Sequence, residues 1–334
     1  LTKTYARFRW STTQNLTPTG TASDGEVEDY ALTIQAPPTQ ACTNTAWYAT
    51  NPTAGGGINL YQMSFVGNAV SITAVPKPAG TPTNALAYSN IAYREADGYF
   101  YATAPNGNGA GSFNTNPTIV KIAGNGARIP LGWPVGLSNA VAMPSSTFGS
   151  DGYFYVNSQA GNMYKIDVTT SPPTVVSTTT IITPPAINGP QDIILSADNK
   201  WAYGFYTVGG GAQFARIDVT QSSASWQLIG PVFPQEGTKV ALGALFRDST
   251  GAIYAAHNGT GNVYRIIIAN ESSATPTVTW TLMASPSSVY DVNNNDGAFC
   301  ASQVFPAAVP TDYSDAPASY GSAGHGIATG VYLG

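Results

Sequence analysis

The stretch Asp-Gly-Tyr-Phe-Tyr-Ala at residues 97–102 is followed by Ile-Val-Lys-Ile at residues 119–122. Each copy of this pattern has a turn, an aromatic strand, a gap rich in Gly and Asn, and a strand in which a charged or amide residue precedes an aliphatic one. The pattern occurs five times, at steps of 53, 54, 48 and 51 residues, anchored on Tyr48, Tyr101, Tyr155, Tyr203 and Tyr254. A regular period of this length, with several short strands per unit, is typical of a β-propeller.

Each repeat is expected to contribute four strands to one blade. Their order is an inner strand before the turn, the aromatic strand, the Lys/Arg-Ile strand, and an outer strand rich in Thr and Val, such as residues 174–177. The first repeat lacks an inner strand, and residues 288–292 are left over after the fifth. We therefore predict an all-β, five-bladed propeller in which residues 288–292 complete the first blade. Six blades are the alternative, because residues 296–300 also resemble an aromatic strand.

Composition restricts the classes of function. Only 9% of the residues are charged, against about 25% in ordinary soluble domains, and such a surface suits a secreted β-protein. The net charge of −5 leaves no basic patch to neutralise phosphates, so we expect neither nucleic acid nor an anionic membrane surface as a partner. No apolar run approaches the roughly 20 residues that cross a bilayer, so we expect no membrane insertion.

The two cysteines, Cys42 and Cys300, lie at the two ends of the repeat region. In a cytosolic protein they would be incidental buried thiols, whereas an exported context favours a disulfide. A closed propeller must join its first and last strands, and a bond between these residues would hold that junction. By restricting the unfolded chain, the bond could add about 4–5 kcal/mol to the free energy of unfolding.

The first 36 residues follow a different pattern. Alternation puts Phe8 and Trp10 on one face of a strand, and we expect this face to be buried. Tyr30 and Leu32 belong to the apolar stripe of a second strand. Two strands alone bury too little apolar surface to be stable, so these strands must pack on the propeller, on each other or on another chain.

Both ends of the chain resemble a known family. The sequence Tyr-Ala-Arg-Phe-Arg-Trp at residues 5–10, followed by Ser-Asp-Gly-Glu-Val-Glu-Asp-Tyr at residues 23–30, resembles the closing segment of the GEVED domain, a β-sandwich module of large secreted bacterial surface proteins. Residues 312–321, with His325, resemble the segment that opens such a module, although Ser314 stands where the family usually has Gly. The repeats are similar to the uncharacterised propeller-like domain that occurs beside GEVED modules.

The resemblance implies four parts. They are a C-terminal fragment of a GEVED-like β-sandwich with connector strands at 1–36, a Pro-rich linker at 37–41, the propeller closed by Cys42 and Cys300 at 42–305, and a linker with the opening segment of a following module at 306–334. The chain would then be an interior piece of a longer exported polypeptide, outside the cell or on its surface.

The leading functional hypothesis is an extracellular structural or adhesive protein. Its propeller would be a rigid bead in a surface or fibre-forming polypeptide, and its terminal strands would offer exposed edges for strand pairing between subunits. The alternative is a carbohydrate- or peptide-binding, lectin-like propeller that stacks its ligand on Trp47, Trp133 and Trp201, although these side chains could instead fill the space between blades. A hydrolase or lyase in the channel is the third hypothesis, with Glu95 and Glu236 as the acids to test.

The sequence implies no organic cofactor and assigns no catalytic residue, but calcium has two candidate sites. The first is a run of oxygen-bearing side chains, which a hard cation prefers: Asp291, Asn293, Asn295 and Asp296. This run departs from an EF-hand loop and also reads as a plain Asn-rich turn. The second is an acidic string in which two carboxylates share a strand face: Asp24, Glu26 and Glu28.

Other recurring charges are expected to be structural. Four acids occupy what reads as the same turn position, where the side chain would bond its own backbone: Asp97, Asp151, Asp198 and Asp296. Four basic residues recur in the third strand and could pair with carboxylates between blades or face solvent: Lys121, Lys165, Arg216 and Arg265.

Overall fold

The computed structural model describes residues 2–34, 37–50, 59–75, 89–104, 118–137, 143–158, 161–182, 190, 192–209, 211–236, 242–286, 295–306, 311–313 and 324–326. The chain divides into two compact units, Leu1–Pro38 and Thr39–Gly334. Among the described residues, no helix has the length and apolar character needed to span a membrane.

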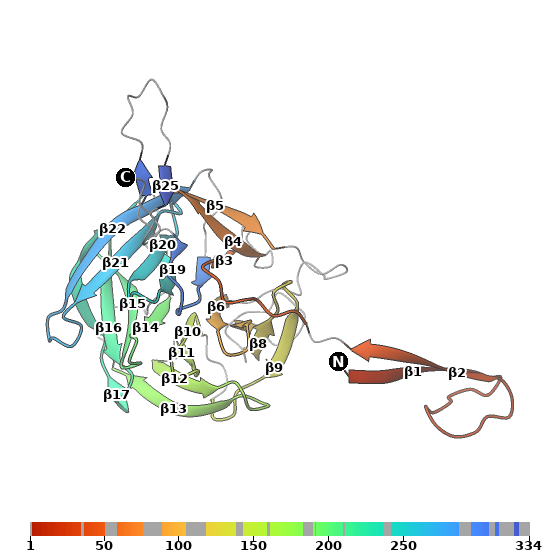
Figure 1. Cartoon of the computed structure of the whole chain (residues 1–334). Helices are drawn as coiled ribbons and strands as arrows, with labels where there is room; N and C mark the ends of the chain where they lie inside the picture. The colour runs from red at the N-terminus through yellow and green to blue at the C-terminus, as the bar shows by residue number, and fades with distance from the viewer. Residues whose placement is uncertain are drawn as a thin grey trace. The chain divides into compact units, whose positions relative to one another are not determined.

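The second unit is a five-bladed β-propeller, as the sequence predicts. Each blade is an antiparallel sheet of four strands, and the inner strands β6, β10, β14 and β19 surround the centre of the ring (Figure 1). The second blade contains β6 (Ser89–Arg94), β7 (Tyr99–Ala104), β8 (Thr118–Ile122) and β9 (Arg128–Gly132). The third contains β10 (Ser145–Phe148), β11 (Phe154–Ser158), β12 (Asn162–Asp167) and β13 (Thr174–Ile181).

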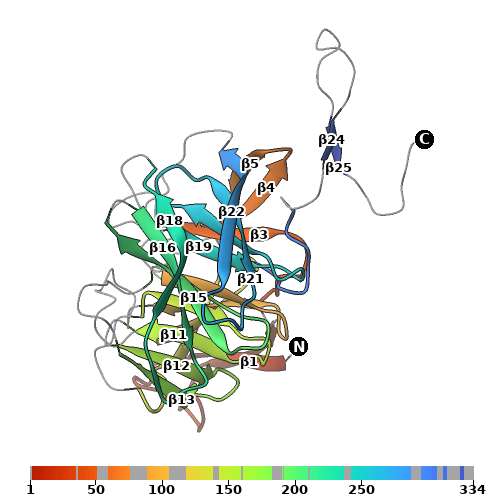
Figure 2. The same cartoon turned by 90° about the vertical axis from the view of Figure 1, so that its left-hand side faces the viewer.

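The remaining blades repeat the arrangement. The fourth contains β14 (Ile193–Leu195), β15 (Trp201–Val208), β16 (Gly211–Asp218) and β18 (Gln227–Pro234). The fifth contains β19 (Leu242–Arg247), β20 (Ile253–His257), β21 (Val263–Ala269) and β22 (Thr277–Pro286). Parallel pairing joins neighbouring blades at the rim. There β17 (Ser223–Ala224) meets β13 (Figure 1), and β22 meets β5 (Ala69–Ala74), which lie side by side in Figure 2.

The first blade closes the ring by combining the two ends of the propeller. Its outer strands are β3 (Ala46–Thr50), β4 (Asn59–Val66) and β5, and its inner strand is β23 (Asn295–Ala298), which pairs antiparallel with β3. The exchange of one late strand for three early ones is therefore confirmed, and the alternative of six blades is excluded. The predicted closing strand was wrong: residues 288–292 lie outside the described residues, and β23 takes their place.

Five apolar clusters hold the blades together, one in each space between neighbouring blades. The anchor tyrosines contribute to these clusters: Tyr48 and Tyr254 meet at the closing junction, in a cluster that also contains Phe305. The Tyr254 and Phe305 rings stack with centroids 4.0 Å apart. Because every blade faces two such clusters, both faces of each sheet are buried. This explains why the sequences of the strands are nearly continuous runs of aromatic and aliphatic residues.

The first unit is a single β-hairpin. Its strands β1 (Thr2–Trp10) and β2 (Glu26–Ile34) pair antiparallel, and the Arg7 guanidinium forms two hydrogen bonds to the Asp29 carboxylate across the ladder. Phe8 and Tyr30 are in edge contact on the other face, with ring centroids 5.7 Å apart.

The predicted apolar side chains of this hairpin do share one face, together with Glu26 and Glu28, but the expectation that this face is buried was wrong. Phe8 is 63% exposed, Trp10 84%, Tyr30 52% and Leu32 48%. The physical reason is that two strands form one layer, and an apolar sheet face is buried only by a second layer. At the other end of the chain, β24 (Thr311–Tyr313) and β25 (Gly324–Gly326) also pair with each other.

Candidate functional site

The inner strands of all five blades contribute to one cavity of about 760 Å³. Its walls come from the ends of these strands and from the turns that follow them, at residues 91–96, 146–150, 194–197, 245–251 and 297–299, with Gly152, Ala301 and Ser302. Each blade supplies only a few consecutive residues, so the cavity exists only in the closed ring. Its volume is in the range of small-molecule sites, about 300–1,000 Å³.

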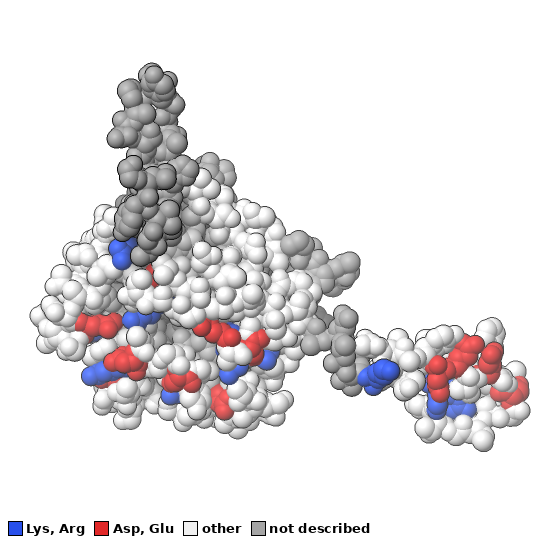
Figure 3. Space-filling model, in the orientation of Figure 1, with Lys and Arg blue, Asp and Glu red and all other residues white. Residues whose placement is uncertain are grey.

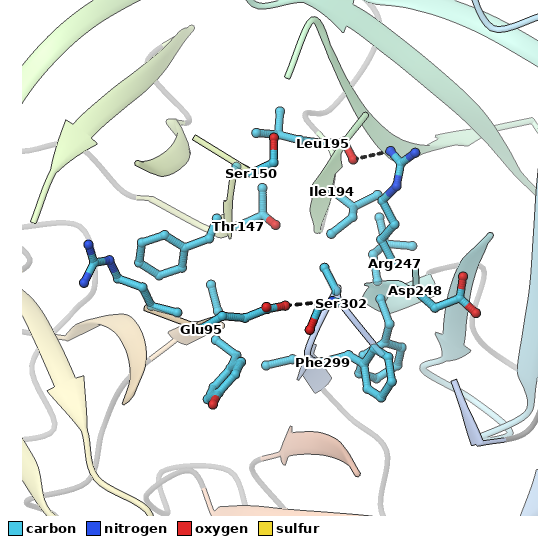
Figure 4. Close-up of a pocket in the computed structure, with 18 of the residues that line it drawn as sticks. Glu95, Thr147, Ser150, Ile194, Leu195, Arg247, Asp248, Phe299 and Ser302 are labelled. Carbon is cyan, nitrogen blue, oxygen red and sulfur yellow. Dashed lines mark hydrogen bonds between the residues drawn. The ribbon is translucent and has the colours of Figure 1, made fainter. Parts of the chain in front are cut away.

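Two groups of opposite charge, Glu95 and Arg247, lie on different sides of this cavity, whose lining also contains Arg94. Glu95 follows β6 and accepts a hydrogen bond from the Ser302 backbone N–H at 2.8 Å, while Arg247 ends β19 and donates to the Leu195 carbonyl at 2.7 Å. The two side chains enter from opposite sides of the cavity (Figure 4). Glu95 is exposed and has a second carboxylate oxygen available to a ligand.

Asp248 also lines the cavity, but its carboxylate is engaged by the protein. Its oxygens accept hydrogen bonds from the Thr250 N–H and hydroxyl, the Tyr254 hydroxyl and the Phe305 N–H. Among the described residues that line the cavity there is no histidine or cysteine.

A pair of buried acids lies beneath the floor of the cavity. The Asp192 carboxylate accepts from the N–H groups of Ile193 and Leu245 at 2.7 and 2.6 Å. Asp296, in β23, accepts from Gly297 at 2.7 Å and from Ile91. Burial, and then the proximity of the Asp296 charge, raise the pKa of Asp192; burial also raises the pKa of Asp296. The two carboxyl groups also interact with each other, so the protonation of one depends on that of the other.

The expectation that Asp296 occupies a turn was therefore wrong. Its carboxylate instead ties the closing strand to β6 of the second blade, while Asp192 ties the fourth blade to the fifth. Asp198 does occupy a turn and accepts from Ser196 and the Lys200 N–H.

Two other recurring acids brace their own blades. Asp97 accepts from the Tyr101 hydroxyl at 2.6 Å and from Lys121 at 2.9 Å. Burial opposes ionisation of Asp97, but the bonds from Tyr101 and Lys121 outweigh it and lower the pKa of this carboxyl. The third blade repeats this arrangement, because the Asp151 carboxylate accepts a hydrogen bond from the Tyr155 hydroxyl and forms a salt bridge with Lys165. Burial, with the bond to Asp151, raises the pKa of Tyr155 to about 12.

Among the described residues, none of the four basic residues forms a salt bridge with a carboxylate of another blade. Lys121 and Lys165 pair within their own blades, and Arg265 lies opposite Tyr254 in the fifth blade. Arg216 does reach the next blade, but it donates to the backbone carbonyls of Glu271 and Ser273.

The calcium candidates are not assembled into one site by the described residues. Asp291 and Asn293 lie outside them, and Asn295 and Asp296 are neighbours in β23. Asn295 is 7% exposed, and neither polar atom of its side chain has a hydrogen-bond partner.

In the hairpin, the Asp24 carboxylate is occupied by hydrogen bonds from Ser11 and Thr12. Glu26 and Glu28 share one face of β2 and are exposed. The Tyr30 hydroxyl donates to Glu28.

The three tryptophans lie outside the residues that line the cavity. Trp47 is 3% exposed and packs between the first and second blades. Trp133 packs against the cluster between the second and third blades and donates to the Leu137 carbonyl. Trp201 is covered by the Arg216 guanidinium, 4.1 Å from the ring centroid.

Of the two acids considered for catalysis, only Glu95 lines the cavity. Glu236 accepts hydrogen bonds from Thr260, Asn262 and Tyr264. Sequence reasoning found Glu95 but missed Arg247, because one arginine at the end of an inner strand carries no motif.

The disulfide predicted from the sequence is present beside the cavity. Cys42 and Cys300 are bonded, with Cα atoms 5.6 Å apart. Ser302 connects the bond to the cavity wall, because its hydroxyl oxygen lies 3.3 Å from each sulfur and its N–H binds Glu95.

Residues 47–302 match the profile of the family described as "Repeat of unknown function (DUF6923)". The match covers the greater part of the chain, and the chain belongs to this family. A comparison with functionally curated proteins gives no significant match.

Among solved structures, the chain is similar to a candidate 6-phosphogluconolactonase from Bacteroides fragilis, with 14% sequence identity and a TM-score of 0.39. The similarity covers 70% of this chain and 66% of the lactonase chain, so it spans just under two thirds of that protein. It is also similar to a chain of the nidogen/laminin complex, at 9% identity over 78% and 99% of the two chains, with a TM-score of 0.45. A third similar structure is virginiamycin B lyase from Staphylococcus aureus with quinupristin, at 14% identity over 86% and 90%, with a TM-score of 0.38.

Proposed function

We propose that this chain is a structural and adhesive module of an exported surface or fibre protein. In this proposal the propeller is a rigid body, and the β1–β2 hairpin is a connector that pairs with another copy of the chain. The GEVED-like sequence of the hairpin supports this role, because a fragment of a sandwich needs further strands to complete it. The Cys42–Cys300 disulfide and the low content of charged residues support an extracellular location.

The exposed apolar face of the hairpin is the observation that carries the proposal. Phe8, Trp10, Tyr30 and Leu32 lie on one face of the paired strands, and each is about half exposed or more. Glu28 and Glu26 lie on the same face, opposite Phe8 and Trp10, so the apolar side chains are bordered by two carboxylates. Among the described residues, β1 and β2 pair only with each other, so each strand also has an unpaired edge. Exposed apolar faces and free strand edges are characteristic of interaction surfaces.

The surface of the propeller offers less for such pairing. On the face shown in Figure 3, acidic and basic residues lie next to one another, with no large area of one sign. Its strand edges are protected by closure of the ring. The hairpin is therefore the better connector.

Light scattering coupled to size exclusion, over a range of concentrations, tests the proposal. We expect the wild-type chain to form dimers or larger assemblies and the double variant Phe8→Ser, Trp10→Ser to remain monomeric. Tyr5→Ser is the matched control, because Tyr5 is 67% exposed on the opposite face of the same strand and should leave assembly unchanged. A wild-type chain that stays monomeric at every concentration would refute the connector role.

A second candidate function is ligand binding in the central cavity. The observation that favours it is that a carboxylate, Glu95, and a guanidinium, Arg247, line the same space of about 760 Å³. A carbohydrate or a peptide could use both groups, since each presents hydroxyl or amide groups to a carboxylate and a guanidinium.

A thermal-shift screen with sugars and short peptides tests this second function. A ligand should raise the melting temperature of the wild type, and Glu95→Gln should abolish the shift. Trp133→Ala should keep it, because Trp133 does not line the cavity. If the shift in melting temperature is lost in Trp133→Ala and kept in Glu95→Gln, the ligand binds at the rim of the propeller and not in the central cavity.

A further inference from the structure

Three distant parts of the chain bring metal-binding atoms together at the junction of the ring. A sulfur of Cys42, a sulfur of Cys300 and a carboxylate oxygen of Glu95 all lie within 4.8 Å of one another. They come from the segment before β3, the segment after β23 and the turn after β6. The Ser302 hydroxyl, 3.3 Å from each sulfur, is a fourth polar group in the same place.

We propose that Cys42, Cys300 and Glu95 form a zinc site when the disulfide is reduced, so that either a covalent bond or a metal ion can hold the junction. A dithiol supplies the two electrons and two protons that break the sulfur–sulfur bond, and it is itself oxidised to a disulfide. Each cysteine thiol then gives up one proton to solvent as its thiolate binds the metal.

The donor set selects zinc over calcium. Thiolates are soft ligands that suit zinc, and calcium takes oxygen ligands. Two thiolates and one carboxylate occupy three positions of a tetrahedral ion, and water or the Ser302 hydroxyl completes the fourth. With zinc–sulfur bonds of about 2.3 Å the two sulfurs must move apart. Cys42 can accommodate this movement, because it is partly exposed and lies outside any strand.

The site is open to both the ion and the reductant. Glu95 is exposed, and Glu95 and Ser302 line the central cavity. A zinc ion bound here would therefore sit in the cavity wall and would keep β23 beside β3 before the disulfide forms. This role does not depend on the proposed connector function of the hairpin.

Anaerobic zinc titration of the full-length chain against a chromophoric chelator tests the proposal. The chain is first reduced with a dithiol and desalted. We expect one zinc ion per reduced chain and none at this site in the oxidised chain. Cys42→Ser should weaken binding at least 100-fold and Glu95→Gln at least tenfold. Glu26→Gln, which alters an exposed glutamate of the hairpin, should leave the affinity unchanged.

Cobalt substitution gives a second readout that does not depend on affinity. Reduced wild type with Co²⁺ should show thiolate-to-cobalt charge-transfer absorption, and Cys300→Ser should lose most of it. If reduction unfolds the chain, zinc should restore its near-ultraviolet circular dichroism in the wild type and not in Cys42→Ser. Absence of stoichiometric binding, equal affinity in Cys42→Ser, or failure of zinc to restore a reduced and unfolded wild type would each overturn the proposal.

Discussion

The propeller and the hairpin both contain strands rich in aromatic residues, yet these side chains are buried in the propeller and exposed in the hairpin. Every blade of the propeller is covered on both faces, and Tyr48, Tyr101, Tyr203 and Tyr254 are each 1% exposed or less. In the hairpin, Trp10 is 84% exposed. The difference shows that in this chain closure, more than strand sequence, decides whether an aromatic strand is buried.

Closure also changes what polar groups can do. In the propeller, Asp296 is buried and joins two blades through backbone N–H groups. In the hairpin, the Arg7–Asp29 ion pair is exposed, with side-chain exposures of 44% and 40%. A buried aspartate therefore helps to hold the propeller together, whereas the exposed ion pair of the hairpin contributes little to the free energy of unfolding.

Removal of the disulfide should affect the two units most unequally. The double variant Cys42→Ser, Cys300→Ser releases a bond between residues 258 positions apart, and it should lower the free energy of unfolding of the propeller by about 5 kcal/mol. Urea denaturation followed by near-ultraviolet circular dichroism measures this loss. The NMR signals of β1 and β2 should not move. An unchanged urea midpoint would mean that the junction is held without the bond.

Substitution of Gly297 should destabilise the packing of the closing strand β23 against the fifth blade. A Cβ atom at this position would lie 2.3 Å from the Phe246 ring and 3.0 Å from Ala244. Gly297→Ala should therefore cost about 1–3 kcal/mol through overpacking. Gly152→Ala is an informative comparison, because the added atom meets nothing within 4 Å and only the backbone at φ +78° is strained. Equal losses in both variants would argue against close packing at the junction.

The closing strand shows where sequence reasoning reached its limit. The period of the anchor tyrosines predicted the ring, the number of blades and the exchange of strands. The closing role was assigned to residues 288–292, and residues 296–300 were considered only as a possible strand of a sixth blade. Asn295–Ala298 was hard to recognise as an inner strand, because Asn, Asp and Gly are uncommon in strands and Asp-Gly marks turns elsewhere in this chain. Tertiary contacts make these residues a strand. Phe246 leaves room only for glycine at 297, and the Asp296 carboxylate is bound by two backbone N–H groups.

The cavity was harder to predict than the fold. Its lining comes from short segments of five blades, about 50 residues apart, and no segment contains a motif. Glu95 could be singled out because it breaks the repeat, whereas Arg247 is the last residue of an ordinary inner strand. The apolar face of the hairpin was predicted correctly from alternation, but its exposure could not be, since burial depends on a second layer outside those two strands.

The raised pKa values of the buried acids Asp192 and Asp296 predict how the stability of the propeller depends on pH. Their pKa values are raised in the folded state above the ordinary carboxyl value of 3.8, so folding favours the protonated form. The stability they contribute is complete below that value and is lost as the pH rises through the folded pKa values, by up to about 1.4 kcal/mol per pH unit for one proton.

Asp296→Asn removes one of the two titrating groups. The variant loses an acceptor for a backbone N–H and should be less stable at every pH, but its stability should fall less between pH 5 and pH 9 than that of the wild type. His257 titrates in the same range, because burial lowers its pKa from 6.5, and its effect cancels in the comparison at each pH. Parallel stability curves for the two proteins would contradict a raised pKa of Asp296 in the folded state.

The smallest effect is expected in the hairpin. Arg7→Ala removes two hydrogen bonds to Asp29, but both side chains are exposed and the pair is screened by solvent. The urea midpoint of the propeller should be unchanged, and the NMR chemical shifts should move only around Asp29. A large shift in the propeller midpoint would mean that the two units are energetically coupled.

Hydrogen–deuterium exchange at low and high protein concentration tests the contrast between the closed ring and the open hairpin most directly. The account predicts that peptides containing residues 46–50 and 295–298 are protected at both concentrations. Peptides containing residues 2–10 and 26–34 should exchange rapidly in dilute solution and become protected when copies associate. Rapid exchange of residues 295–298, or hairpin protection that does not depend on concentration, would contradict it.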